Sequence, residues 1–238
     1  MKIDLNNRIA LVIGGTGSLG TAICTQLSKS GAMVITDYNH DDISNWQQSL
    51  QDAEINITAM KADITDFDEC VTLVENIENQ IGPIDIIVNS NELDNIVPFN
   101  KMDVEQWDEA MTTNIDALFN ICRNVADKMC DRGFGRIINI SSIIARMGES
   151  ERAHLAAAKS GIHGFTMALS QEVGKKGVTV NTVSPGMLDQ VEDRLKNTAP
   201  KSISDGENVA YLVDFLCSDQ AAHINGVDIS INGGEYLH

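Results

Sequence analysis

The sequence is poor in positive charge, in long apolar runs and in paired cysteines. It has 17 lysines and arginines against 34 aspartates and glutamates, which gives a net charge of -17. That charge opposes binding to nucleic acid and to anionic membranes, so we expect neither as a partner. No apolar run approaches the length that a bilayer-spanning helix needs. The first apolar stretch, at residues 9–13, runs directly into glycine, which predicts a strand rather than a signal peptide and hence a cytoplasmic protein.

The five cysteines are odd in number, and no two of them form a Cys-x-x-Cys pair. All of them fall within segments of apolar periodicity. We therefore expect ordinary reduced thiols in the core and no metal site, with a metal or redox role as the alternative. The cysteines are Cys24, Cys70, Cys122, Cys130 and Cys217.

Short apolar runs rich in β-branched residues alternate with longer segments of helical periodicity along the chain. The run Ile-Asp-Ile-Ile-Val at 84–88 suits a strand that is buried on both faces, as in a parallel sheet. The length of 238 residues suits one large domain, 1–238. We predict an α/β fold with a doubly wound, parallel seven-stranded sheet of the Rossmann type. The expected strands are 8–14, 32–38, 55–64, 84–90, 136–142, 178–184 and 227–232.

Apolar spacing and capping residues predict the main helices. One helix follows Thr65 as its cap and covers 67–81, and a longer one follows Asp103 and covers 107–129. Another is expected at 153–173.

A glycine-rich turn at 14–20 follows the first expected strand and opens a helix. In that context glycines let backbone amides approach a pyrophosphate at a helix N-terminus. Asp37 closes the second expected strand, where a carboxylate can accept from both ribose hydroxyls and would repel a 2′-phosphate. The pattern favours NAD over NADP as the cofactor, if one binds. The alternative for Asp37 is an ordinary turn residue at a strand end.

Five further stretches carry a family likeness, in order along the chain: Gly20–Cys24, Asp131–Ser142, His163–Leu169, Gly177–Gly186 and Asn232–Gly234. Through them the sequence resembles the short-chain dehydrogenase/reductase family, and within it the acetoacetyl-CoA reductases and the related 3-oxoacyl reductases. The resemblance implies NAD(P)H-dependent reduction of a 3-oxoacyl thioester, with an acyl-CoA-like small molecule as ligand.

In that family a Ser, a Tyr, a Lys and an Asn carry the proton transfer. The resemblance gives these roles to Ser142, Lys159 and Asn114, whereas the Tyr position, one helical turn before Lys159, holds Leu155. Leucine has no proton to donate, and His154 points about 100° away from that position on a helix. We therefore expect the usual reductase activity to be lost or strongly weakened. The alternative is an active NAD(H)-dependent reductase with a different proton donor.

The resemblance also outlines a cofactor site, which this sequence departs from in several places. Ser18 stands where the family has Gly, and Asn91 and Glu92 stand where it has Ala and Gly, so we expect weak dinucleotide binding. Acidic residues at 148–152 would oppose an anionic CoA thioester, and the lid expected at 187–204 is short. The implied cofactor residues are Gly14, Gly15, Ser18, Leu19, Gly20, Asp37, Asp63, Asn89, Lys159, Pro185 and Gly186.

The segments that pair subunits in the family are present. They are the helices at 107–129 and 153–173 and the C-terminal stretch 226–234. The resemblance implies a homotetramer, or a mixed oligomer with an active paralogue.

Overall fold

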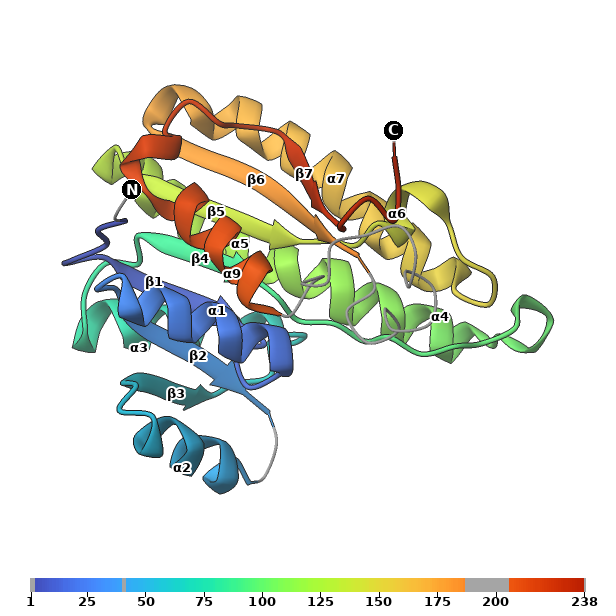
Figure 1. Cartoon of the computed structure of the whole chain (residues 1–238), viewed down its shortest axis with the longest axis horizontal. Coiled ribbons are helices and arrows are strands. Elements are labelled where there is room, and N and C mark those ends of the chain that lie inside the picture. The colour runs from blue at the N-terminus through green and yellow to red at the C-terminus, as the bar shows by residue number, and fades with distance from the viewer. Residues whose placement is uncertain (1–2, 40–41, 187–205, 238) are drawn as a thin grey trace.

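A computed structural model describes residues 3–39, 42–186 and 206–237 of the chain. The strands are β1 (Ile9–Ile13), β2 (Met33–Tyr38), β3 (Ile57–Lys61), β4 (Ile86–Asn89), β5 (Gly135–Ile140), β6 (Val178–Pro185) and β7 (Asp228–Ile231). They form one seven-stranded sheet in the order β3-β2-β1-β4-β5-β6-β7, and every neighbouring pair is parallel. The chain winds outward from β1 in both directions, so the predicted doubly wound α/β fold is confirmed (Figure 1).

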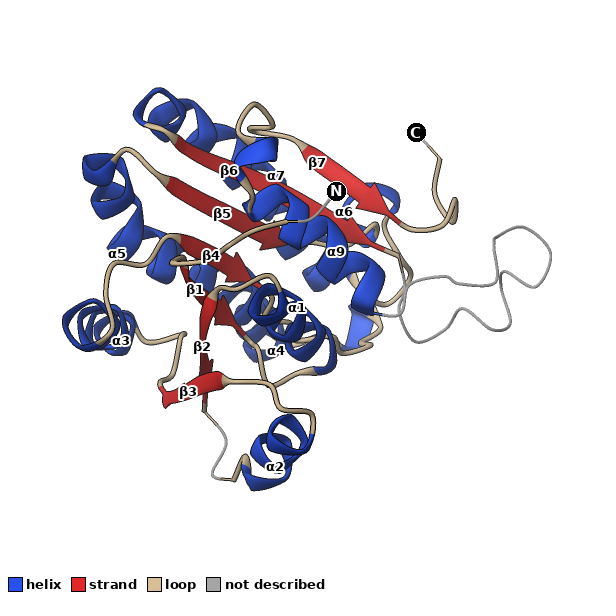
Figure 2. Cartoon of the chain, turned by 60° about the vertical axis from the view of Figure 1, so that its left-hand side comes forward, coloured by secondary structure: helices blue, strands red, loops and turns tan. Residues whose placement is uncertain are grey.

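Helices cover both faces of this sheet (Figure 2). On one face lie α1 (Ser18–Lys29) and α9 (Gly206–Cys217), which pack side by side. On the other face lie α3 (Phe67–Gln80), α5 (Ala117–Arg132) and α7 (Ala153–Val173). The shorter helical elements are α2 (Ser44–Asp52), α4 (Val104–Met111), α6 (Ile144–Met147), η1 (Phe99–Lys101), η2 (Thr112–Asp116), η3 (Gly174–Lys176) and η4 (Asp219–Ala221).

Two apolar cores flank the sheet, and alternate residues of the same strand enter different cores. In β4, Ile86 and Val88 pack with α1 and α9, whereas Ile87 packs with α3 and α5. Successive side chains of a strand point to opposite faces, so a strand covered on both sides must be apolar throughout. This explains why the continuous apolar runs predict the strands.

Several element boundaries differ from the predicted ones. The strand predicted at 55–64 is shorter, because the Ile55 amide closes the end of α2 by donating to the Leu50 carbonyl. Thr65 does not cap α3. The cap is Asp66, whose carboxylate accepts from the amides of the first turn, while the Thr65 amide and hydroxyl both donate to Asp63 Oδ1.

The long helix predicted at 107–129 is interrupted. α4 begins behind Asp103, as predicted, because Asp103 and Gln106 form a reciprocal capping box. The π-helical segment η2 then separates α4 from α5. A π-turn inserts an extra residue into the helical repeat, and such turns are frequent at functional sites. Here the inserted turn carries Asn114, whereas the helix predicted at 153–173 is continuous.

The five cysteines are buried and unpaired, as predicted for core thiols. Burial raises the pKa of Cys70 and of Cys122 to about 12, so both are protonated at neutral pH. Within the described ranges no helix is long and apolar enough to cross a membrane.

Candidate functional site

A cavity of about 710 Å³ opens beside the carboxyl ends of the central strands. Its walls come from the turn after β1, the end of β2 and the segment after β4, including Gly17, Asp37, Ser90 and Glu92. β1 and β4 are neighbours that lead away to opposite sides of the sheet. Such a switch point is where open α/β sheets bind ligands.

The glycine turn has the backbone geometry of an anion site. Gly14 has a positive φ of 75°, and an added Cβ there would lie 2.9 Å from Asn91 Cα. A Cβ at Gly20 would collide with the Gly14 carbonyl oxygen and lie 2.7 Å from Gly15 Cα. α1 starts at Ser18 with neither a side-chain cap nor an acidic residue in its first turn. Its first amides and the positive end of its dipole therefore face the cavity side of the turn.

Asp37 lies at the end of β2, as predicted, and is buried. Its Oδ1 accepts from the Gly14 amide at 2.7 Å, which ties the carboxylate to the glycine turn. The Gly15 amide donates to Thr36 Oγ1 at 3.0 Å in the same way. Asp37 thus holds the turn and also lines the cavity, so the structural and the ribose-binding interpretations of this residue are compatible.

The structure brings the expected catalytic positions together at the ends of β5, η2 and α7. Ser142 Oγ accepts from the Ile144 amide at 3.2 Å, and Asn114 Nδ2 donates to the Ala110 carbonyl at 3.0 Å. Lys159 Nζ lies 3.4 Å from the Ile140 carbonyl oxygen. Leu155 is fully buried one turn before Lys159. The position that the family resemblance assigns to the proton donor is therefore a buried hydrocarbon side chain on the same helix as Lys159.

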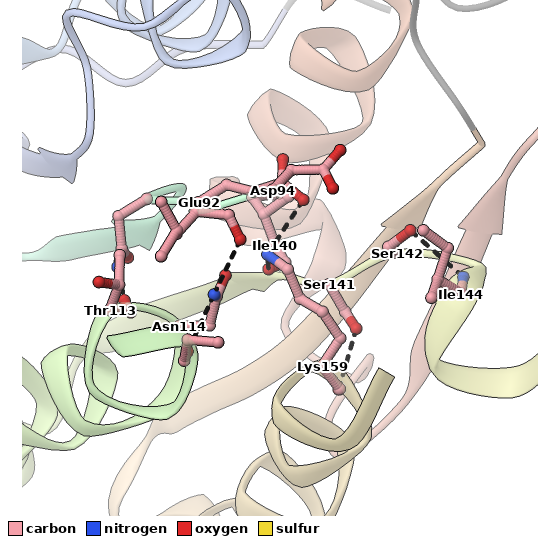
Figure 3. Close-up of polar contacts among 12 residues, drawn as sticks. Glu92, Asp94, Thr113, Asn114, Ile140, Ser141, Ser142, Ile144 and Lys159 are labelled. Carbon is pink, nitrogen blue, oxygen red and sulfur yellow. Dashed lines mark hydrogen bonds and ion pairs between the residues drawn. The ribbon is translucent and has the colours of Figure 1, made fainter. Parts of the chain in front are cut away.

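Glu92 forms an ion pair with Lys159 across this site. Glu92 Oε1 lies 3.7 Å from Lys159 Nζ, and the lysine side chain is 1% exposed against 43% for the glutamate. Figure 3 shows Lys159 and Asn114 pointing toward the segment that carries Glu92 and Asp94. A buried ammonium needs a counter-charge. Glu92 supplies that charge from within the protein.

The segment that follows Glu92 lies across the N-terminal end of α7. Asp94 Oδ2 lies 3.0 Å from Arg152 Nη1, and Arg152 Nε lies 3.3 Å from Glu149 Oε2. The Asn95 amide oxygen is hydrogen-bonded to His154 Nε2. The Val97 amide donates to a backbone carbonyl just before α7, at 2.8 Å. Burial raises the pKa of Asp94, with Arg152 opposing, and burial lowers the pKa of His154.

These contacts were not predicted from the sequence. Asp94 and Asn95 lie outside the residues that the family resemblance singles out, Arg152 was noted only as part of the segment 148–152, and His154 was expected to be an ordinary histidine. The unusual segments after β4 and before α7 therefore contact each other. Asp94 and Arg152 carry opposite charges, but nothing in the sequence indicates that the two side chains form an ion pair.

Other expected cofactor residues do not line the cavity. Asn89 Nδ2 donates to Asn139 Oδ1 at 2.8 Å within the sheet, and Asp63 Oδ1 accepts from Thr65 as described above. Pro185 ends β6, and an added Cβ at Gly186 would lie 2.7 Å from Glu235 Oε2. The lid predicted at 187–204 lies outside the described residues. The expected residues that do line the cavity are Gly14, Ser18, Leu19, Gly20 and Asp37.

Known proteins match this sequence over most of its length. The family model described as short chain dehydrogenase matches residues 8–200. An acetoacetyl-CoA reductase of Allochromatium vinosum is 38% identical, over 97% of this chain and 99% of the relative. An acetoacetyl-CoA reductase of Cupriavidus necator is 36% identical, over 98% and 100%. A 3-oxoacyl-(acyl-carrier-protein) reductase of Haemophilus influenzae is 33% identical, over 98% and 100%.

Proposed function

The chain belongs to the short-chain dehydrogenase family, and from that premise we propose a relative of the acetoacetyl-CoA and 3-oxoacyl reductases in which carbonyl reduction is lost or strongly weakened. Family membership and these reductase relatives imply a nicotinamide cofactor. The proposal depends on one observation. The position one turn before Lys159 holds Leu155, a buried hydrocarbon.

Reduction of a ketone requires a proton at the carbonyl oxygen, and a positioned acid contributes on the order of 10²- to 10⁴-fold to the rate. Leu155 cannot donate that proton. His154, the residue before Leu155 in the chain, is an alternative acid, but it is buried and its Nε2 is hydrogen-bonded to Asn95. Lys159 faces the carboxylate of Glu92, so its charge is already compensated. Ser142 and Asn114 would still orient a carbonyl, without an acid to complete the reaction.

The two halves of the cofactor site differ in their fit. The glycine turn and Asp37 suit a diphosphate and a ribose. The other half does not suit a nicotinamide riboside. The Lys159 ammonium, which would hold the ribose of that group, is already paired with the Glu92 carboxylate. If a dinucleotide binds, Asp37 favours NAD over NADP, because a carboxylate repels a 2′-phosphate.

The alternative is an active NAD(H)-dependent reductase with another proton donor. It is supported by the presence of Ser142, Asn114 and Lys159 at the positions that the family resemblance assigns to its catalytic group. The substrate class argues against it, because Glu149 and Glu151 add negative charge beside α7, where an anionic acyl-CoA thioester would have to approach.

An activity assay separates the two possibilities. NADH and NADPH oxidation should be followed at 340 nm with acetoacetyl-CoA as substrate, using one of the reductase relatives as the positive control. We expect the wild-type chain to stay at the rate of the enzyme-free reaction. Robust turnover with either cofactor would refute the proposal directly.

We also propose that the chain self-associates as a homotetramer, or forms a mixed oligomer with an active paralogue. Apolar side chains are exposed on α5 and α7, with Phe119 48% and Met167 53% exposed. A hollow of about 380 Å³ lies between these helices and is lined by Phe119, Phe165 and Leu169. Exposed apolar surface of this kind marks interaction sites. Light scattering at micromolar concentration tests the proposal, and a purely monomeric species would refute the homotetramer.

A further inference from the structure

We infer that the cavity binds a ribonucleoside 5′-diphosphate, and that it discriminates against the nicotinamide dinucleotides. The inference rests on the proposed function, because it explains what a site without carbonyl reduction still binds. Three features of the cavity support it: the glycine turn, the polar groups beside it, and the paired residues that follow β4.

The glycine turn holds a phosphate group through its backbone. The absence of side chains at Gly14 and Gly20 is enforced by contacts with Asn91 and with the turn itself. Ser18 is exposed at the first position of α1, where its hydroxyl adds a donor to the helix amides. The phosphate is therefore held by amides and a dipole, and no Lys or Arg is present among the described residues that line the cavity.

Two polar groups beside the turn suit a ribose. The Asp37 carboxylate is fixed by the Gly14 amide at the edge of the cavity, in position to accept from a vicinal diol. Ser90 lines the cavity directly after β4, and its hydroxyl is buried with no hydrogen-bond partner in the described part of the chain. A buried polar group without a partner is unfavourable, so a ligand that approaches Ser90 has a group to satisfy.

Asn91, Glu92 and Thr113 also line the cavity, on the side of the segment that follows β4. The Asn91 side-chain amide is hydrogen-bonded to the Thr113 carbonyl, and Glu92 is paired with Lys159. A nicotinamide riboside would have to displace Glu92 and leave either that carboxylate or the buried Lys159 without its partner. A third phosphate would face the Glu92 carboxylate, and like charges repel. A diphosphate that ends at the turn avoids both penalties.

Calorimetry on the full chain tests the inference, with ADP, GDP, ATP and NADH as probes. A fluorescence titration gives a second readout in the Trp107→Phe background, because Trp46 Nε1 donates to Thr21 Oγ1, which in turn donates to the Gly15 carbonyl of the turn. We expect the Kd of ADP or GDP to be lower than the Kd of ATP and of NADH by a factor of about ten or more. NADH binding as tightly as the better nucleoside diphosphate, or no binding of either diphosphate, would overturn the inference.

Variants separate the parts of the site. Asp37→Asn keeps an acceptor for the Gly14 amide but removes the charge, and we expect ADP to bind about 10- to 100-fold more weakly, as for a lost hydrogen bond to a charged group. In this variant ADP and 2′-deoxy-ADP should also bind equally. The exposed Asp52→Asn is the matched control, with unchanged binding expected. An unchanged ADP affinity in Asp37→Asn would refute the proposed contact between Asp37 and the ribose.

Glu92→Gly should raise NADH affinity about tenfold or more, and by a larger factor than it changes ADP affinity, and Glu92→Gln tests whether charge alone is responsible. If NADH affinity stays unchanged in Glu92→Gly, Glu92 does not limit the cavity and the inference fails. Tight NADH binding without turnover would contradict this inference and leave the proposed function standing. Turnover of acetoacetyl-CoA together with a preference for ADP would contradict the proposed function and leave this inference standing.

Discussion

The two halves of the cleft lie along one edge of the same sheet, yet they are built differently. The half at β1 and β2 is open, and its binding groups are backbone amides whose position glycine geometry dictates. In the half at β5 and α7, which we call the closed half, several charged and polar side chains pair with one another. Lys159 pairs with Glu92, Arg152 with Asp94, and His154 with Asn95.

The difference shows that the second half is not simply a damaged site. A lost proton donor alone would leave Lys159 facing an open cleft. Instead, residues after β4 and residues at the start of α7 contact each other, and Glu92, Asp94, Glu149 and Arg152 all take part in ion pairs there. Because unpaired buried charges are strongly unfavourable, these residues depend on each other.

The largest expected effect tests whether the closed half can be reopened. Leu155→Tyr alone should give little or no gain in acetoacetyl-CoA reduction, because Glu92 still holds Lys159. Adding Ser18→Gly, Asn91→Ala and Glu92→Gly should do more than the sum of the single changes, toward the 10²- to 10⁴-fold that a general acid supplies. The measurement is NADH oxidation by wild type, the single variant and the quadruple variant.

The triple variant without Leu155→Tyr is the matched control, and it should remain inactive. Robust turnover by Leu155→Tyr alone would show that the missing phenol is the only defect. In that case Glu92 would be displaced easily, and the contrast between the two halves would disappear.

The sequence predicts the open half and the fold more fully than the closed half. Continuous apolar runs suit a sheet covered on both faces, and a glycine turn between a strand and a helix is typical of a phosphate-binding turn, so the strands and the expected phosphate side follow from local patterns. The family resemblance places Ser142, Asn114 and Lys159, which the structure brings together.

The pairs that close the second half could not be predicted. Asp94 and Arg152 are 58 residues apart in the chain, and Asn95 and His154 are 59 apart. Local spacing carries no information on such contacts, because they depend on the path of the segment after β4. The π-turn at Asn114 was missed for a related reason, since apolar periodicity continues through it.

A second test compares charges in the closed half with charges on the surface. Arg152 is 7% exposed and bridges Asp94 and Glu149, so Arg152→Ala should lower the free energy of unfolding by about 2–4 kcal/mol, as for a broken, largely buried pair. Arg123 is 59% exposed and pairs with Asp127 on the same helix. Arg123→Ala should therefore change the free energy of unfolding by less than about 0.5 kcal/mol. Urea denaturation measures both, and equal losses would contradict the role of the bridge.

The open half should be sensitive to backbone crowding instead. Gly20→Ala should lower the free energy of unfolding by about 1–3 kcal/mol, as for overpacking, because the new methyl group meets the backbone of Gly14 and Gly15. It should also abolish ADP binding. Gly164 lies on α7 with nothing near its position, so Gly164→Ala should be neutral or stabilise by up to about 1 kcal/mol. Thermal denaturation and calorimetry compare the two, and unchanged stability of Gly20→Ala would show that the turn can relax.

The smallest expected effect concerns the pH dependence of the closed half. His154 is buried, its Nε2 is bonded to Asn95, and its Nδ1 has no hydrogen-bond partner among the described residues. Protonation would place a second N–H there without an acceptor. Burial therefore lowers the pKa of His154, with Asp94 opposing and Arg152 adding to the shift.

A histidine in the unfolded chain has a pKa of about 6.5. Below that pH the unfolded state binds the extra proton and the folded state resists it, so stability falls as the pH drops from about 6.5 toward the lowered pKa. One histidine contributes at most about 1.4 kcal/mol per pH unit.

The pKa of half-buried His163 is lowered as well, and this residue remains in both proteins compared, so the difference between wild type and His154→Gln isolates His154. Asp94, whose pKa is raised, contributes in the opposite direction, because a folded state that binds its proton more readily gains stability in acid. Urea denaturation between pH 7 and 5.5 should show a steeper loss of stability for wild type than for His154→Gln. The exposed His223→Gln should follow wild type. Parallel curves for wild type and His154→Gln would mean that His154 accepts its proton in the folded state, and the region around α7 would then be wetter and less closed than its contacts indicate.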